Sequence, residues 1–176
     1  MLIAAVALAA AVACAPTPAE LHAGLAGQWR GALGYRDYQS NKLFELPVTT
    51  EFRMIPDAAT EVAVSAFDDG PKAGTVYITS LSLFDAKAGT VISTSFRKAG
   101  RPDIETGQVS VTAFGDATHW TLIYEATASD DNKPARIRVT ETRDGETLLS
   151  VKEVAPNAPE GAPFRFRNQT RLTRVP

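Results

Sequence analysis

Few residue types in this chain could support catalysis. The sequence holds 2 His and 1 Cys, too few ligands for a Cys/His zinc site. His119 follows the turn at 115–118, and a general base there needs a partner within hydrogen-bond reach, which the sequence does not nominate. No nucleophile elbow, phosphate-binding glycine loop or His-Glu-x-x-His motif occurs. We expect no metal and no cofactor, and an enzyme of unknown reaction is the least favoured of the functions weighed below.

Two arginines could bind a carboxylate. Arg136 and Arg138 share one side of the run 134–143, and facing a cavity they would clamp an acidic head group. Ile137 and Val139 form the apolar side of the same run. We therefore expect the two arginines to face solvent.

The N-terminal segment is typical of export. Residues 2–13 are small and apolar, which suits the central region of a signal peptide over residues 1–13. "AVAC" at 11–14 is similar to a bacterial lipobox, so Cys14 is predicted to be lipidated and to anchor the chain to a membrane. Cleavage after Ala13 without lipidation is the alternative. Both predict a bacterial cell-envelope, periplasmic or secreted location, with residues 14–24 as a tether before one domain at 25–176.

Composition narrows the class of protein. The chain has 176 residues, 44% of them hydrophobic, enough for one domain with its own core. Its formal net charge is −2 and its basic residues are scattered, so nothing favours a nucleic-acid partner. With a single Cys, the core holds the fold without an internal disulfide.

From residue 28 onward, the sequence predicts one strand after another. Thr, Val, Ile and aromatic residues form runs separated by Gly, Pro, Asn or Asp. "RDGE" at 143–146 is the strongest hairpin signal. No helical periodicity separates the runs, which favours antiparallel pairing. The predicted strands are 28–38, 43–55, 61–67, 74–84, 89–97, 106–114, 118–127, 134–143, 146–154 and 164–174.

Most runs have one apolar side, as in a sheet with a single buried face. Closing such a sheet removes its exposed edges, so we predict an all-β, antiparallel up-and-down barrel of about 8–10 strands, with a β-sandwich as the alternative. The run 74–84 breaks the alternation, because Val76 and Ile78 lie on one parity and Leu81 and Leu83 on the other. A β-bulge near residues 79–80 would reconcile them.

The two ends of the domain carry a resemblance to a known group. Gly27 and Trp29 open the first strand, and Arg171 and Arg174 lie late in the last. This combination resembles the calycins, which comprise lipocalins and the fatty-acid-binding and nitrobindin-like barrels. The resemblance implies that Trp29 closes one barrel end beneath an arginine, and parity favours Arg174. A nitrobindin-like barrel would need a haem-ligating His late in the chain, and residues 164–176 contain none.

The predicted function is non-catalytic binding of a small apolar or amphipathic ligand inside the barrel. A filled barrel that binds another envelope protein is the alternative. A void of about 300 Å³ or more would favour the ligand. The candidate lining combines inward aromatic residues with a few polar ones, namely Tyr35, Phe52, Trp120, Tyr124, Phe164, Phe166, Asn168 and Thr170.

The lipobox interpretation predicts that Cys14→Ala moves the protein from the membrane fraction to the soluble fraction. A single acyl chain holds a protein only marginally, so stable anchoring requires the complete modification at Cys14. Fractionation of the native host followed by immunoblotting measures the distribution. An unchanged distribution would exclude lipidation.

Overall fold

The computed structural model describes residues 15–36, 42–130, 133–159 and 161–176. Cys14 and the segment 1–13 lie outside the described residues, so the predictions made for them stay predictions. No helix in the described ranges is long and apolar enough to cross a membrane.

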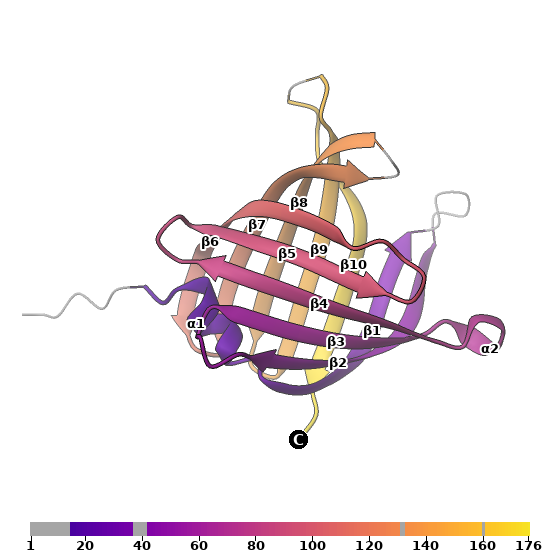
Figure 1. The fold of residues 1–176 in the computed structure, drawn as a ribbon, viewed down its shortest axis with the longest axis horizontal. Helices are drawn as coiled ribbons and strands as arrows, with labels where there is room; N and C mark the ends of the chain where they lie inside the picture. Colours follow the sequence, from indigo (N-terminus) through magenta and orange to yellow (C-terminus); the bar gives the residue numbers. More distant parts are fainter. Residues whose placement is uncertain (1–14, 37–41, 131–132, 160) are drawn as a thin grey trace, which may run out of the picture.

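Ten antiparallel strands close into one up-and-down barrel (Figure 1), which confirms the predicted fold class. Each strand pairs with its neighbours in sequence, and β1 closes the ring by pairing with both β2 and β10. The strands are β1 (Gly27–Arg36), β2 (Leu43–Met54), β3 (Thr60–Asp68), β4 (Thr75–Asp85), β5 (Thr90–Arg97), β6 (Asp103–Asp116), β7 (His119–Asp130), β8 (Lys133–Asp144), β9 (Thr147–Pro156) and β10 (Arg165–Arg174). Two short helices, α1 (Pro18–Ala23) and α2 (Gly70–Ala73), complete the described chain.

The hairpin predicted at 143–146 is confirmed. Asp144 pairs with Thr147, so two residues connect β8 to β9. Gly145 has φ 59°, the left-handed conformation that glycine adopts without steric cost in tight hairpin turns.

The bulge expected near residues 79–80 is absent. β4 pairs in continuous register with β3 and with β5. Because Phe84 is buried inside the barrel, strict alternation turns Leu81 and Leu83 outward. Bulges occur instead in β6 and in β10, between Phe166 and Asn168. Apolar residues therefore occur on both sides of β4 because its outer side is also apolar. The strand itself is regular.

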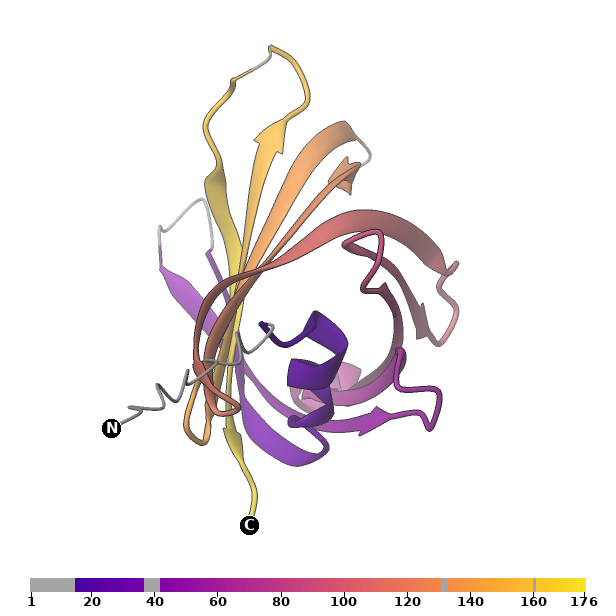
Figure 2. The same ribbon diagram turned by 90° about the vertical axis from the view of Figure 1, so that its left-hand side faces the viewer.

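Residues predicted to be a tether are part of the barrel domain. Thr17 caps α1 in a reciprocal capping box with Glu20, and Pro18 occupies the first turn. Ala19, Leu21 and His22 are buried. Viewed along the barrel in Figure 2, α1 sits within the ring of strands at one end. The helix is the floor of the barrel, because its apolar side chains complete the core there.

Trp29 is the centre of that floor. Its side chain is fully buried, and its Nε1–H donates to the carbonyl of Leu25 at 2.7 Å. The guanidinium carbons of Arg174 and Arg143 lie 5.5 Å and 5.8 Å from the indole centroid, within cation–π range. Arg171 is exposed. Arg174 therefore occupies the position that the calycin resemblance implied, and Arg143 is a second cation that sequence reasoning missed.

We expect Trp29→Ala to lower the free energy of unfolding by about 3–5 kcal/mol, because it opens a large cavity in the floor. Arg174→Ala should cost less. In a double-mutant cycle the two should couple by about 0.5–2 kcal/mol. Urea unfolding measures each value, and Arg143→Ala tests the second cation. Strict additivity with Trp29→Ala for both arginines would show that neither ring contact contributes.

Candidate functional site

A cavity of about 240 Å³ lies inside the barrel, bounded by α1. Its lining combines apolar side chains with carboxylates and hydroxyls, a mixture suited to a small amphipathic molecule. Strands β2 to β8 supply most of the lining, which comprises His22, Phe52, Glu61, Ser82, Val91, Ser93, Glu105, Gly107, Tyr124, Glu125, Ala126, Ile137, Val139 and Glu141.

His22 links α1 to the strands at the base of the cavity. Its Nδ1 is 2.7 Å from Oε2 of Glu61 on β3. Its Nε2 is 2.6 Å from the hydroxyl of Tyr124 on β7 and 3.0 Å from Oε1 of Glu141 on β8. The contact with Glu141 is an ion pair without hydrogen-bond geometry, since Oε1 has no hydrogen-bond partner among the described residues. Both imidazole nitrogens are therefore occupied.

Opposing electrostatic effects set the protonation of this cluster. Burial alone would lower the pKa of His22, but Glu61 and Glu141 favour the imidazolium more strongly and raise the pKa from 6.5 to about 10. Burial and the same two carboxylates raise the pKa of the Tyr124 phenol well above its ordinary value. At neutral pH the cluster thus holds an imidazolium at His22 and a neutral phenol at Tyr124.

This chemistry suits a structural tie better than proton transfer. A general base needs a nitrogen free to accept a proton, whereas His22 is protonated and engaged on both sides. The described residues contain no group of three or more His, Cys, Asp or Glu arranged to hold a metal ion. The cluster fixes α1 and leaves the cavity wall acidic.

Sequence reasoning missed His22, Glu61 and Glu141. His22 falls in a segment that was predicted to be a tether, so no buried role was considered for it. Glu141 did carry a signal, because it shares the parity of Ile137 and Val139, the apolar side of β8. A buried carboxylate needs a buried hydrogen-bonding or charged partner. The position of Glu141 therefore predicts a histidine or an arginine in the barrel interior.

The predicted lining residues divide by location. Phe52 and Tyr124 line the cavity. Trp120 packs in the floor, 2% exposed, with its ring centroid 6.0 Å from that of His22. Tyr35 is 40% exposed and stacks on Phe44. Asn168 and Thr170 lie in the part of β10 that pairs with β1, opposite Tyr35 and Leu33, and neither lines the cavity.

Phe164 and Phe166 do not line the cavity. The bulge in β10 pairs Phe166 with Glu153, and the Phe166 ring lies 5.7 Å from the guanidinium carbon of Arg36. Phe164 precedes β10 and lies beneath the guanidinium of Arg138, 4.0 Å from ring centroid to carbon. A bulge reverses the alternation on one side of itself, and alternation cannot reveal this without the partner strand.

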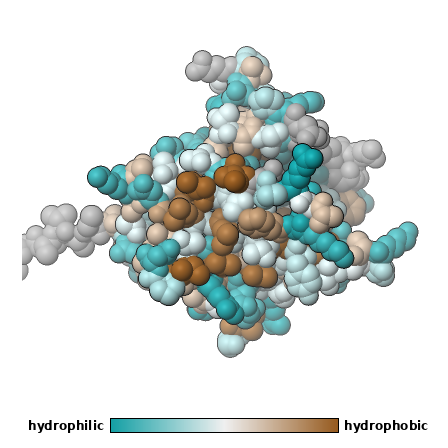
Figure 3. Space-filling model, in the orientation of Figure 1, coloured by the Kyte–Doolittle hydropathy of each residue, from teal (hydrophilic) through white to brown (hydrophobic). Residues whose placement is uncertain are grey.

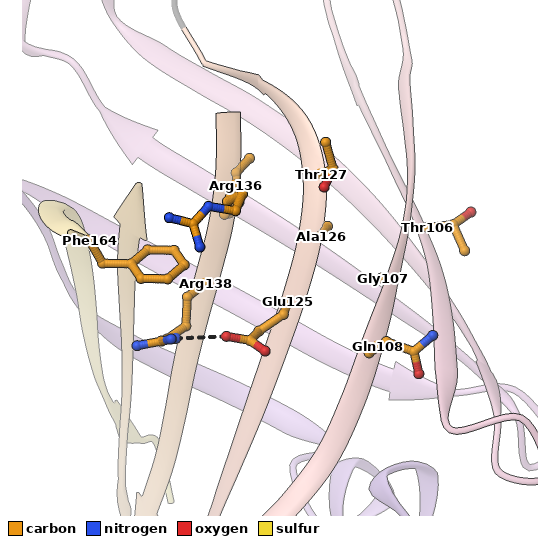
Figure 4. Close-up of a pocket in the computed structure, with 10 residues that line it drawn as sticks. Thr106, Gly107, Gln108, Glu125, Ala126, Thr127, Arg136, Arg138 and Phe164 are labelled. Carbon is orange, nitrogen blue, oxygen red and sulfur yellow. Dashed lines mark hydrogen bonds and ion pairs between the residues drawn. The ribbon is translucent and has the colours of Figure 1, made fainter. Parts of the chain in front are cut away.

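The outer surface also carries a groove of about 490 Å³ between β6 and the Phe164 ring (Figure 4). Arg136 and Arg138 point toward Phe164 there. Arg138 pairs with Glu125 at 2.9 Å, and Arg136 donates to the Ala162 carbonyl at 2.6 Å. Both arginines were predicted to face solvent. They do lie on the outer side of β8, but both are half-buried, because the Phe164 ring packs against their guanidinium groups. Both guanidinium groups bind groups on the outer surface, Glu125 and the Ala162 carbonyl, and neither reaches the barrel interior.

His119 stands apart from both spaces. It begins β7, directly after the turn from β6, and is half-exposed with Nδ1 2.9 Å from Asp116. The Thr118 hydroxyl and His119 hold the pKa of the Asp116 carboxyl well below its ordinary range. The contacts are those of a surface turn.

The fold and cavity define a closed ten-strand barrel with an acidic internal pocket. Neither family models nor curated proteins provide a match to the chain. Among solved structures, that of Rv2717c from M. tuberculosis is similar, with a TM-score of 0.61 and 17% sequence identity over 90% of this chain and 98% of that one. This likeness is one of fold and is consistent with a calycin-like barrel.

The raised pKa of His22 predicts a dependence of stability on pH. Folded His22 keeps its proton up to about pH 10, whereas the unfolded chain loses it near 6.5. The folded state therefore binds more protons between these values, and stability falls as pH rises through that window, by on the order of a few kcal/mol. Below pH 6.5 the contribution is complete.

Urea unfolding at pH 6, 8 and 10 measures this slope. His22→Gln removes the titrating group and keeps a side chain that can donate to Glu61, so it serves as the matched variant. The variant should be less stable than the wild type at pH 6 and should lose most of the slope. Equal slopes in both proteins would contradict the assignment.

Proposed function

We propose that the protein binds a small amphipathic molecule in the internal cavity and that it acts without catalysis. The observation that carries the proposal is the cavity itself, a space of about 240 Å³ that the side chains of α1 and the strands leave unfilled. It is somewhat below the size of about 300 Å³ typical of the smaller ligand pockets. The ligand is accordingly small, about the size of a two-ring aromatic molecule.

The lining favours a ligand whose polar end is positively charged. Three carboxylates belong to this lining, those of Glu61, Glu105 and Glu141, and His22 is the only cationic side chain among the lining residues. Glu125 also borders the space, but Arg138 pairs with its carboxylate outside. Lys152 lies opposite Val139 in the register yet does not line the cavity. Excess negative charge in a low-dielectric pocket attracts a cation such as an ammonium group.

The rest of the lining suits an apolar body. Phe52, Val91, Ile137 and Val139 present carbon surface to the same space. Burying such surface contributes roughly 25 cal/mol per Å². An aromatic or alkyl amine can therefore contact the carboxylates and the apolar side chains at once.

The location proposed with this function is the bacterial cell envelope or the space outside the cell, with a lipid at Cys14 as the anchor. The export-like segment at 1–13 and the lipobox-like residues at 11–14 support it.

A pair of matched probes tests the proposal by titration calorimetry. Naphthalen-1-ylmethylamine carries a cation on a two-ring body, and 1-naphthaleneacetate carries an anion on the same body. We expect saturable micromolar binding of the amine and much weaker binding of the acid. Glu105→Gln should reduce this preference, because Glu105 forms no ion pair within the described part of the chain.

Ala126→Phe fills the cavity from β7 and should abolish binding while circular dichroism shows the fold intact. Thr127→Phe, the next residue along the same strand, is exposed and should leave binding unchanged. If neither probe binds the wild type, the interior acts as a packed core, and the alternative of a protein-interaction module takes precedence.

A further inference from the structure

An apolar face covers the outside of β3, β4, β5 and the start of β6. Figure 3 shows hydrophobic side chains gathered on the side of the barrel where Figure 1 places these strands. Exposure is 46% for Leu83, 44% for Ile92, 45% for Phe96 and 74% for Ile104. Apolar residues scattered singly need no explanation, whereas a contiguous patch marks an interaction site. We call this set, with Val62, Val64, Tyr77 and Leu81, the outer apolar face.

The strand register shows that the face is continuous. Leu83 is opposite Ile92. Val62 is opposite Leu81, which is opposite Thr94. Thr94 is in turn opposite Ile104, so one row crosses four strands. Directly opposed residues in a sheet lie within contact distance. From Tyr77 to Leu83 the face extends about 20 Å along β4.

Basic residues border one end of this face. Arg97 ends β5, and Lys98 and Arg101 lie in the connection to β6. All three are exposed, and residues 97–102 include no acidic side chain. Phe96 and Ile104 stand at the two sides of that connection. Apolar side chains flanked by Lys and Arg are typical of a surface that lies in the interfacial region of an anionic bilayer.

The described chain begins at the other end of the face. Ala15 lies in a groove with Phe84, Asp85 and Gly89. Phe84 directly follows Leu83 in β4, so the chain enters the barrel beside the Leu83–Ile92 pair. The residues that precede Ala15 are Cys14 and the apolar segment 2–13. Any membrane attachment made there brings this end of the face to the bilayer.

We propose that the outer apolar face rests on a lipid bilayer, with the Leu83–Ile92 end beside the N-terminal attachment and the 97–101 basic residues over anionic head groups. A second copy of the chain or another protein would explain the apolar side chains alone. A bilayer also accounts for the basic residues at one end and for the N-terminal entry at the other.

Depth-dependent fluorescence quenching tests the orientation in the full-length chain. The native Trp29 and Trp120 are 0% and 2% exposed, and the wild-type signal is subtracted. Ile92→Trp places a reporter on the face. Leu149→Trp places a matched reporter on β9, on the far side of the strand order, with alternation from the buried Leu148 turning it outward. The vesicles contain phosphatidylcholine and phosphatidylglycerol with brominated acyl chains.

We expect the vesicles to quench most of the Ile92→Trp emission and little of the Leu149→Trp emission. Equal quenching of both reporters, or quenching of neither, would show that the barrel does not rest on this face, even if the N-terminus holds the chain to the vesicle. A blue shift of Ile92→Trp that depends on protein concentration in the absence of lipid would assign the face to a second copy. Either result would overturn the proposal.

Discussion

The buried imidazolium of His22, held between Glu61 and Glu141, is the interaction on which the floor of this barrel depends. It connects a six-residue helix to β3 and β8, strands that lie far apart in the ring. So short a helix is not stable alone in water. Tertiary contacts must hold it, and here they include a charged tie as well as Leu21. Removing one member of a buried ion pair leaves its partner charged and desolvated, at a cost of about 3–5 kcal/mol.

A second set of charges secures the chain directly after α1. Arg143 donates to the Gly24 carbonyl at 2.9 Å and to the Ala117 carbonyl at 3.2 Å, and Arg174 donates to Gly24 at 3.0 Å. These carbonyls follow a helix end or lie in a turn, where strand pairing does not satisfy them. The two guanidinium groups also cover the Trp29 ring. The floor thus unites α1, β1, β8 and β10, and the space it closes is the cavity on its inner side.

Local alternation and turn chemistry were sufficient to predict the strands, the hairpin at Gly145, the closed sheet and the outward arginines of β8. The strands, the hairpin and the outward arginines follow from neighbours within a few residues, whereas the closed sheet was favoured over a β-sandwich because closure removes exposed edges. The missing features depend on partners distant in sequence. His22 acquires its role from Glu61, 39 residues away, and from Glu141. Phe166 turns outward because β10 is bulged against β9. Leu81 and Leu83 face outward in β4, although their apolar character alone predicts an inward position.

The strands that build the acidic cavity also build the outer apolar face, by the two-residue period of a β-strand. In β3, Glu61 faces inward and Val62 outward, and in β4, Ser82 lines the cavity between Leu81 and Leu83. In β5, Ser93 lines it next to Ile92. At these positions the strands invert the usual pattern of apolar inside and polar outside, although Phe84 and Val91 of the same strands are buried in the core. A polar interior costs free energy unless its groups are satisfied, and apolar side chains in water forfeit the stabilisation of burial. Both costs arise in the same four strands, so a molecule inside and a surface outside would each relieve one of them.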